Sequence, residues 1–222
     1  MKLLSTIVFL SINSVLYAQD QWRKIEEVTT REISVNCSGL DDLVLKNSTD
    51  NFLRISLDNK SSDNYVIDTR QIYDTTEIFY QFEEKSFIED GVFRKFITRR
   101  MNNVSTIIEV PEGKSIVIHG ESLGVKSESY KGDLSVYIKT GNIYLYKIEG
   151  VCKISFYQGN LYTSSSGLNL NIISNKGAIV SNGRSLESPV FQEKGTTKKQ
   201  LNVQTILGNI FINSSNQPHT SK

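Results

Sequence analysis

Apolar and polar residues alternate with a period of two along most of this 222-residue chain. Clear examples are the segments 52–57, 78–82 and 115–118, which are rich in β-branched and aromatic residues. Such alternation is typical of strands that bury one face. After the first 18 residues, no segment keeps apolar residues at helical spacing over three turns. The pattern therefore predicts an all-β protein.

Turn-forming residues separate the predicted strands. The polar segments 58–64 and 89–91 each lie between two apolar runs. In the sequence Val110-Pro111-Glu112-Gly113, the proline at the second position and the glycine at the fourth suit a type I turn. The segment 185–200 lacks strand alternation and is expected to form an exposed loop, after which alternation returns at 201–206.

Glycines recur at nearly even intervals in the second half of the chain. Their positions are 124, 132, 141, 150, 159, 167 and 177, which gives spacings of 8, 9, 9, 9, 8 and 10. Several of these glycines are followed by Asn or Asp and then by an aliphatic residue. A second apolar residue stands two positions after the aliphatic one. The clearest copies of this repeat begin at Gly132, Gly141, Gly159 and Gly208.

This repeat predicts short strands that each begin after a glycine corner. Glycine adopts the backbone angles that a corner requires, and Asn or Asp can hydrogen-bond locally there. A repeat of about nine residues cannot bury its own apolar face, so it must stack on its neighbours. A short β-solenoid and a set of tight hairpins both meet this requirement, and the even spacing favours the solenoid.

The expected organisation has four parts. Residues 1–18 form a signal peptide, and residues 19–104 form a β-rich N-terminal region. Residues 105–212 form the β-solenoid repeat region, packed on the N-terminal region or continuous with it. Residues 213–222 form a disordered tail, because they are polar and terminal.

The signal peptide is inferred from three features. Lys2 provides a positive start, an apolar run extends from Leu3 to Leu16, and Ala18 precedes a polar segment. The run is shorter than the roughly 20 apolar residues of a membrane span, although an uncleaved anchor is the alternative. We therefore expect an exported protein with no transmembrane segment in its mature chain. Its expected location is the periplasm, the outer-membrane surface or the extracellular space.

Two cysteines, Cys37 and Cys152, follow the signal peptide. An even number of cysteines in an exported chain suggests one disulfide. Each cysteine also continues an alternating apolar series, which predicts that both face the core, where a free thiol behaves as a small hydrophobe. The sequence leaves both alternatives open, a bridge and two buried thiols. Neither cysteine has a second Cys or His at ligand spacing, so no metal site is expected.

The charge balance argues against nucleic acid as a partner. Lys2 is the only charged residue among the first 18, so 24 basic and 24 acidic residues remain after it. A protein without a basic field gains little from counterion release.

No catalytic or cofactor motif stands out. The sequence Gly113-Lys114-Ser115 lacks the earlier glycine of a phosphate-binding loop, because position 108 is Ile. His119 is expected at an exposed strand position and His219 in the polar tail. We therefore expect a protein that is not an enzyme and holds no cofactor.

Clusters of charge are expected on solvated turns. Adjacent acidic pairs occur at 41–42, 83–84 and 89–90, but neighbours on a strand point to opposite faces and cannot flank one glycosidic bond. A basic cluster could bind an anionic headgroup or an acidic glycan, although balancing the acidic stretch 83–90 is the favoured interpretation. Its members are Arg94, Lys95, Arg99 and Arg100.

Outward tyrosines are the best candidates for a binding surface. The aliphatic residues expected to face inward are Leu134, Val136, Ile143, Leu145, Ile154 and Leu161. Alternation then directs Tyr137, Tyr144, Tyr157 and Tyr162 outward, with Tyr146 beside them. On successive repeats they would form a ladder that can bind a sugar or a protein. Alternatively, the rings only stabilise the sheet by cross-strand pairing.

The export signal, the β-rich first half and the Gly-Asn/Asp-aliphatic strands resemble bacterial "putative adhesin" domains, including the head GIN type of the Bacteroidetes. The resemblance covers about residues 105–212, and the first half is similar only in character. It implies a short β-solenoid on an exported envelope protein, with no catalytic residues to carry over. The repeats differ from that group in having more Tyr and Lys and in being interrupted at 185–200.

The expected function is that of an exported, non-enzymatic envelope protein that acts as an adhesin or a binding scaffold. Its expected partner is a surface glycan or an envelope protein. Two alternatives remain open. One is a carbohydrate-active enzyme whose acidic residues are brought together by the fold, and the other is a periplasmic protein whose open end binds the sheet edge of a partner.

Overall fold

The structure is a computed structural model that describes residues 24–58, 65–82, 104–193 and 197–213. These residues form seventeen strands, β1 to β17, and no helix lies within the described ranges. The prediction of an all-β protein is confirmed. All seventeen strands belong to one mixed sheet that is not closed.

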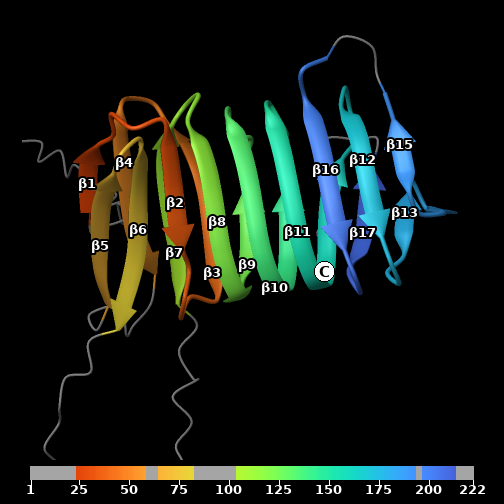
Figure 1. Ribbon diagram of the computed structural model, residues 1–222, viewed down its shortest axis with the longest axis horizontal. Coiled ribbons are helices and arrows are strands. Elements are labelled where there is room, and N and C mark those ends of the chain that lie inside the picture. The colour runs from red at the N-terminus through yellow and green to blue at the C-terminus, as the bar shows by residue number, and fades with distance from the viewer. Residues whose placement is uncertain (1–23, 59–64, 83–103, 194–196, 214–222) are drawn as a thin grey trace, which may run out of the picture.

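The sheet bends into two layers (Figure 1). The front layer contains, in spatial order, β5 (Tyr65–Ile72), β6 (Thr75–Phe82), β2 (Glu32–Asn36), β8 (Ser115–Ser122), the first half of β10 (Asp133–Leu145), the first half of β11 (Val151–Ser164), β16 (Gln200–Thr205), β12 (Asn169–Ser174) and β15 (Val190–Gln192). The back layer contains β1 (Lys24–Glu27), β4 (Phe52–Asp58), β7 (Ser105–Pro111), β3 (Asp42–Ser48), β9 (Gly124–Ser127), the second halves of β10 and β11, β17 (Asn209–Asn213), β13 (Ile179–Ser181) and β14 (Arg184–Leu186).

Strands in the middle of both layers are parallel, and the outermost pairs are antiparallel. Successive repeats lie in register, so that Ile116, Leu134 and Cys152 occupy equivalent positions on β8, β10 and β11. Equivalent residues of these repeats are 18 positions apart in the sequence. The glycine spacing of about nine therefore corresponds to one layer, and two spacings return the chain to the same layer.

The spatial order of the strands departs from their order in the sequence at two places. The pair β2 and β3 lies between the pair β6 and β7 and the pair β8 and β9. Near the other end, β16 and β17 lie between β11 and the pair β12 and β13 (Figure 1). The sheet is therefore continuous from the N-terminal region into the repeat region.

The core lies between the two layers and consists mainly of aliphatic side chains, with a few aromatic rings and buried Ser and Thr residues among them. All six residues predicted to face inward are buried, and they are Leu134, Val136, Ile143, Leu145, Ile154 and Leu161. Successive side chains along a strand point alternately into the core and toward solvent. The periodicity of the sequence was therefore sufficient to identify these six inward residues.

Both cysteines are buried and free. Cys37 follows β2 and Cys152 lies on β11, with β8 and β10 between them. Three strand spacings amount to about 14 Å, whereas the Cα atoms of a disulfide lie within about 7 Å of each other. The suggested bridge is therefore wrong and the alternative of two buried thiols is correct. Burial raises the pKa of each thiol to about 12.

The glycine corners are required for two reasons. Gly141 and Gly159 have φ angles of +151° and +130°, which L side chains rarely adopt. They also stack directly on each other, because a Cβ on Gly159 would lie 1.8 Å from the carbonyl oxygen of Gly141. A side chain at this corner would force neighbouring strands apart.

The asparagines after these glycines hydrogen-bond between strands rather than within their own turn. Asn160 donates from Nδ2 to Oδ1 of Asn142 at 3.0 Å, and Asn209 donates to Oδ1 of Asn160 at 3.2 Å. The backbone N–H of Ala178 then donates to Oδ1 of Asn209 at 3.0 Å. We call these residues the asparagine ladder, and it connects four consecutive back-layer positions.

The segment 185–200 is not wholly a loop. It contributes to β14, and it contains β15, in which Val190 pairs with Ile172 of β12. Both strands are only three residues long, so the sequence offers little alternation from which to predict them. β14 forms a hairpin with β13, and β15 pairs antiparallel with β12 at the same end of the sheet.

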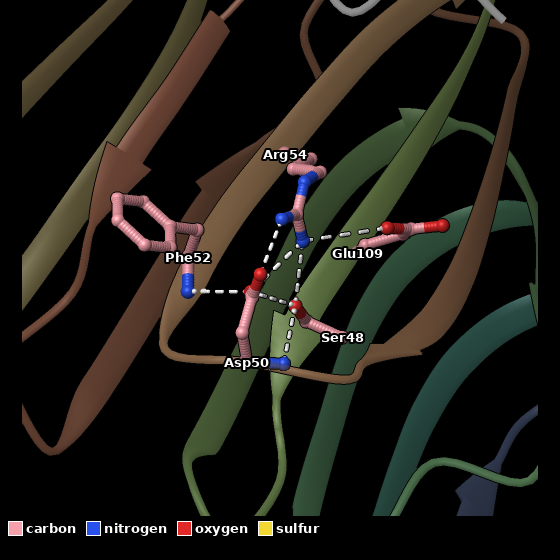
Figure 2. Close-up of polar contacts among 5 residues, drawn as sticks. All are labelled: Ser48, Asp50, Phe52, Arg54 and Glu109. Atoms are coloured by element: carbon pink, nitrogen blue, oxygen red, sulfur yellow. Dashed lines mark hydrogen bonds and ion pairs between the residues drawn. The ribbon is translucent and has the colours of Figure 1, made fainter. Parts of the chain in front are cut away.

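The turn between β3 and β4 is held by a cluster of charges (Figure 2). Nη1 of Arg54 donates to Oδ1 of Asp50 and to Oγ of Ser48, each at 2.9 Å. The backbone N–H of Phe52 donates to Oδ1 of Asp50 at 3.0 Å, and Glu109 on β7 lies 3.8 Å from the same guanidinium. These contacts connect the turn to the adjacent strand.

Several predictions lie outside the described residues. These are the signal peptide, the acidic pairs at 83–84 and 89–90, the basic cluster from Arg94 to Arg100, and the tail from 214 onward. Among the residues that are described, no helix is long and apolar enough to cross a membrane.

Candidate binding site

The four predicted tyrosines lie on two layers rather than on one surface. Tyr137 and Tyr157 belong to the front layer, whereas Tyr144 and Tyr162 belong to the back layer. Each of β10 and β11 turns at its glycine corner between its two tyrosines. Alternation correctly directs the side chains away from the core, but it does not show that the strand changes layers.

The back layer carries a stack of three aromatic rings. The ring centres of Tyr144 and Tyr162 lie 4.9 Å apart, and their ring planes are inclined by 7°. The ring centres of Tyr162 and Phe211 lie 5.1 Å apart, with an angle of 12° between the planes. Phe211 was not among the predicted ring residues, although it occupies the same position in the repeat that begins at Gly208. The ring of Tyr162 is covered on both faces, so only ring edges are available there.

Tyr146 lies beside this stack and not within it. Nζ of Lys126 is 5.2 Å from the centre of the Tyr146 ring and 2.8 Å from Oε1 of Glu128. The hydrogen bond to Glu128 raises the pKa of Lys126. Lys126 is therefore engaged in contacts within the protein.

A groove of about 540 Å³ lies on the back layer at one end of the stack. Gly124 provides no side chain there, and the Asp42 carboxylate occupies the space above it. Burial, and secondarily the neighbouring Asp41, raise the pKa of Asp42. Residues contributing polar groups to the groove are Asp42, Ser105, Lys126, Asn142 and Tyr144.

The front layer carries a separate aromatic pair. The ring centres of His119 and Tyr137 lie 5.4 Å apart, and their ring planes are inclined by 15°. Both side chains are exposed, as predicted for His119. On the neighbouring strand β11, the residue opposite Tyr137 is Ser155. Because serine is small, the ring of Tyr137 is not covered on that side.

A groove of about 310 Å³ lies beside this ring, and we call it the front groove. Ser155 lies beside Tyr137 in it, and Gln204 and Ile173 follow on β16 and β12. A second row of residues, one on each of β11, β16 and β12, lines the rest of the front groove. These residues are Lys153, Asn202 and Asn171.

Tyr157 is also on the front layer but outside the front groove. It is 44% exposed, and its backbone carbonyl accepts a hydrogen bond from the N–H of Leu207 at 2.8 Å. No ring stacking involves it among the described residues. Of the four predicted tyrosines, Tyr137 is therefore the one whose ring adjoins the front groove.

The acidic pair within the described residues has a structural contact. Oδ2 of Asp41 accepts a hydrogen bond from the backbone N–H of Val104 at 3.0 Å, while Asp42 lines the groove on the back layer. Within the ranges that the structure describes, no group of three or more His, Cys, Asp or Glu side chains could hold a metal ion.

Comparison with known proteins gives similarity at the level of structure. No family model matches the chain, and no curated protein matches it. A crystal structure described as a "putative cell adhesion protein" from Clostridium sporogenes ATCC 15579 is similar, with a TM-score of 0.53 and 13% identity. The similarity covers 86% of this chain and 97% of that chain. At this identity the likeness shows a shared fold.

Two further crystal structures are more distant. They are described as putative adhesins from Bacteroides fragilis NCTC 9343 and Parabacteroides distasonis ATCC 8503, and each is 12% identical. Their TM-scores are 0.31 and 0.20, over 86% of this chain and 95% and 94% of theirs. Scores at this level do not establish a common fold.

Proposed function

We propose that this chain is an exported, adhesin-like binding protein of the bacterial envelope, built as a short β-solenoid and without enzymatic activity. The observation that carries the proposal is the fold shared with the Clostridium sporogenes protein, which is described as a "putative cell adhesion protein". The resemblance of the glycine repeats to bacterial "putative adhesin" domains points in the same direction.

The strand register supports the solenoid. Equivalent residues of β8, β10 and β11 follow each other every 18 positions, and each turn passes through both layers. Stacked parallel turns present a regular outer surface, because every second residue of every strand points outward. Such a surface suits an extended ligand.

The outer surface supports binding rather than catalysis. Its two grooves combine aromatic rings with amide, hydroxyl and charged groups. The Clostridium sporogenes structure, which shares this fold, is described as a "putative cell adhesion protein" and not as an enzyme. A glycosidase would need two carboxylates on either side of a scissile bond, and Asp41 is instead used to bind the backbone of Val104.

Protease accessibility on intact cells tests the location. An antibody raised against the mature chain would follow the protein while protease is added outside the cells. We expect digestion from outside, with a periplasmic protein left intact as the control. Protection until the envelope is opened would contradict a surface adhesin and would favour a periplasmic binding scaffold.

A further inference from the structure

We propose that the front groove binds an acidic glycan, with one sugar ring stacked on Tyr137 and its polar groups held by the surrounding side chains. The inference rests on the proposed function, because it names the ligand class of an adhesin-like surface. The side chains expected to contact the glycan are Tyr137, Lys153, Ser155, Asn171, Asn202 and Gln204.

The ring of Tyr137 has one face available to a ligand. His119 covers one face, and Ser155 on the other side is too small to cover the second. The side chain is 42% exposed. An aromatic face carries negative charge density, so the C–H bonds of a sugar ring pack on it favourably. By contrast, Tyr162 is stacked on both faces and can offer only its edge.

The polar part of the groove matches the hydroxyl groups of a sugar. Asn171, Asn202 and Gln204 each carry both a donor and an acceptor, as a hydroxyl group does. Nε2 of Gln200 already donates to Oδ1 of Asn202 at 3.0 Å, which orients that amide. Several neighbouring amides can therefore form paired hydrogen bonds with adjacent hydroxyl groups.

Asn171 provides an independent indication that a polar ligand enters here. Its Oδ1 is buried and accepts no hydrogen bond from any described residue. A buried acceptor without a donor costs free energy, and this one belongs to a residue that lines the groove. A ligand hydroxyl group in the groove would supply the donor once the Asn171 side chain turns its oxygen toward the groove.

The charge of the groove favours an acidic sugar. Lys153 is exposed and forms no ion pair within the described part of the chain, and no carboxylate lines the groove there. A uronic acid or sulfate group would therefore meet a cation and no competing anion. The volume of about 310 Å³ is at the lower end of the range for small-ligand sites, which suits a short stretch of a longer glycan.

Four variants test the site. Ser155→Tyr extends the His119–Tyr137 stack and fills the groove, and the only expected contact that it removes is the small Ser155 hydroxyl group. Tyr137→Ala removes the exposed ring. Lys153→Gln removes only the charge. Tyr162→Ala is the matched control, since it removes an outward tyrosine of the adjacent strand on the other layer. Thermal unfolding of each variant establishes that it is folded.

Binding would be measured on a printed array of neutral, uronic acid and sulfated glycans, followed by titration calorimetry with the glycan that binds. We expect Ser155→Tyr and Tyr137→Ala to weaken binding by about tenfold or more, and Tyr162→Ala to leave it within about twofold. Lys153→Gln should weaken the binding of acidic glycans and leave the binding of neutral glycans unchanged.

Two results would overturn the inference. Unchanged binding by Ser155→Tyr would reject the groove, and a folded wild-type protein that binds no glycan would reject the ligand class. Neither result affects the proposed surface location, which protease digestion of intact cells reports independently. If Tyr137→Ala fails to fold, Ser155→Tyr and Lys153→Gln still decide the question.

Discussion

At the scale of single residues, the side chains that hold this protein together act mainly between strands. Asn160 hydrogen-bonds to Asn142 on one side and to Asn209 on the other. Asp50 is different, because it organises its own turn through Arg54, Phe52 and Ser48 (Figure 2). Hydrogen bonds from Arg54 first, and then from Phe52 and Ser48, hold the pKa of Asp50 well below its ordinary value.

This lowered pKa predicts a pH-dependent contribution to stability. Because the pKa of Asp50 is lower in the folded state, its contribution is complete above the unfolded pKa of about 4 and is lost as the pH falls through the folded pKa. Asp50→Asn should lower the unfolding temperature at pH 7, and the difference from wild type should narrow below about pH 4.

Thermal unfolding of both proteins between about pH 2 and pH 7 measures this effect. Arg54→Gln should show the same narrowing, since it removes the other half of the pair. A difference that stays constant over the whole pH range would contradict the role of the carboxylate charge.

At the scale of elements, the corner between the two layers depends on the absence of a side chain. Gly159 stacks on Gly141 so closely that a Cβ cannot fit between them. The asparagine ladder begins one residue later and keeps the strands at the spacing that this stacking requires. The corner therefore determines where β10 and β11 pass from the front layer to the back.

Replacing Gly159 by alanine should be far more destabilising than replacing a glycine that also has a positive φ but lies in open space. Gly183 has a φ of +78°, and nothing lies within 4 Å of the position that a Cβ would take there. We expect Gly183→Ala to cost about 1–2 kcal/mol, the ordinary penalty of that conformation. Gly159→Ala adds a clash with the Gly141 carbonyl and should cost about 4 kcal/mol or more.

Chemical unfolding of the two variants gives this comparison directly. Equal losses of unfolding free energy would mean that the neighbouring strand can move away, and that close stacking at the corner is not required.

At the scale of the whole molecule, the last described strands hold the end of the sheet in place. β12 and β13 pair with β16 and β17, and their other partners are only the short strands β15 and β14. β16 and β17 also pair with β11. The segment 169–192 therefore connects to the remaining sheet through strands that come later in the chain.

A chain that ends at residue 193 should lose this end of the sheet. Without β16 and β17, the segment from β12 to β15 has no strand of the main sheet to pair with, so we expect it to be digested rapidly. Limited proteolysis followed by mass spectrometry would show cleavage after β11, and the full-length chain is the control. Protection of the truncated chain up to its last strand would contradict the role of β16 and β17.

Local periodicity was sufficient to predict the all-β class, the inward residues of β10 and β11 and the outward direction of the tyrosines. These properties depend on alternation within one strand, which the sequence displays directly. The glycine spacing likewise indicated the corners at Gly141 and Gly159, because a side chain cannot be accommodated there, whereas a Cβ at Gly167 would meet nothing within 4 Å.

The tertiary structure decided which strands are neighbours. The placement of β2 and β3, and of β16 and β17, out of sequence order depends on pairing between distant segments, which no local pattern encodes. The same pairing separates Cys37 from Cys152 and divides the tyrosines between two layers. The front groove exists because Ser155 follows Tyr137 across the sheet, 18 residues later in the chain. The sequence by itself therefore determined which way the side chains of the long, alternating strands point. Their neighbours across the sheet were set only when distant strands paired to bury their apolar faces.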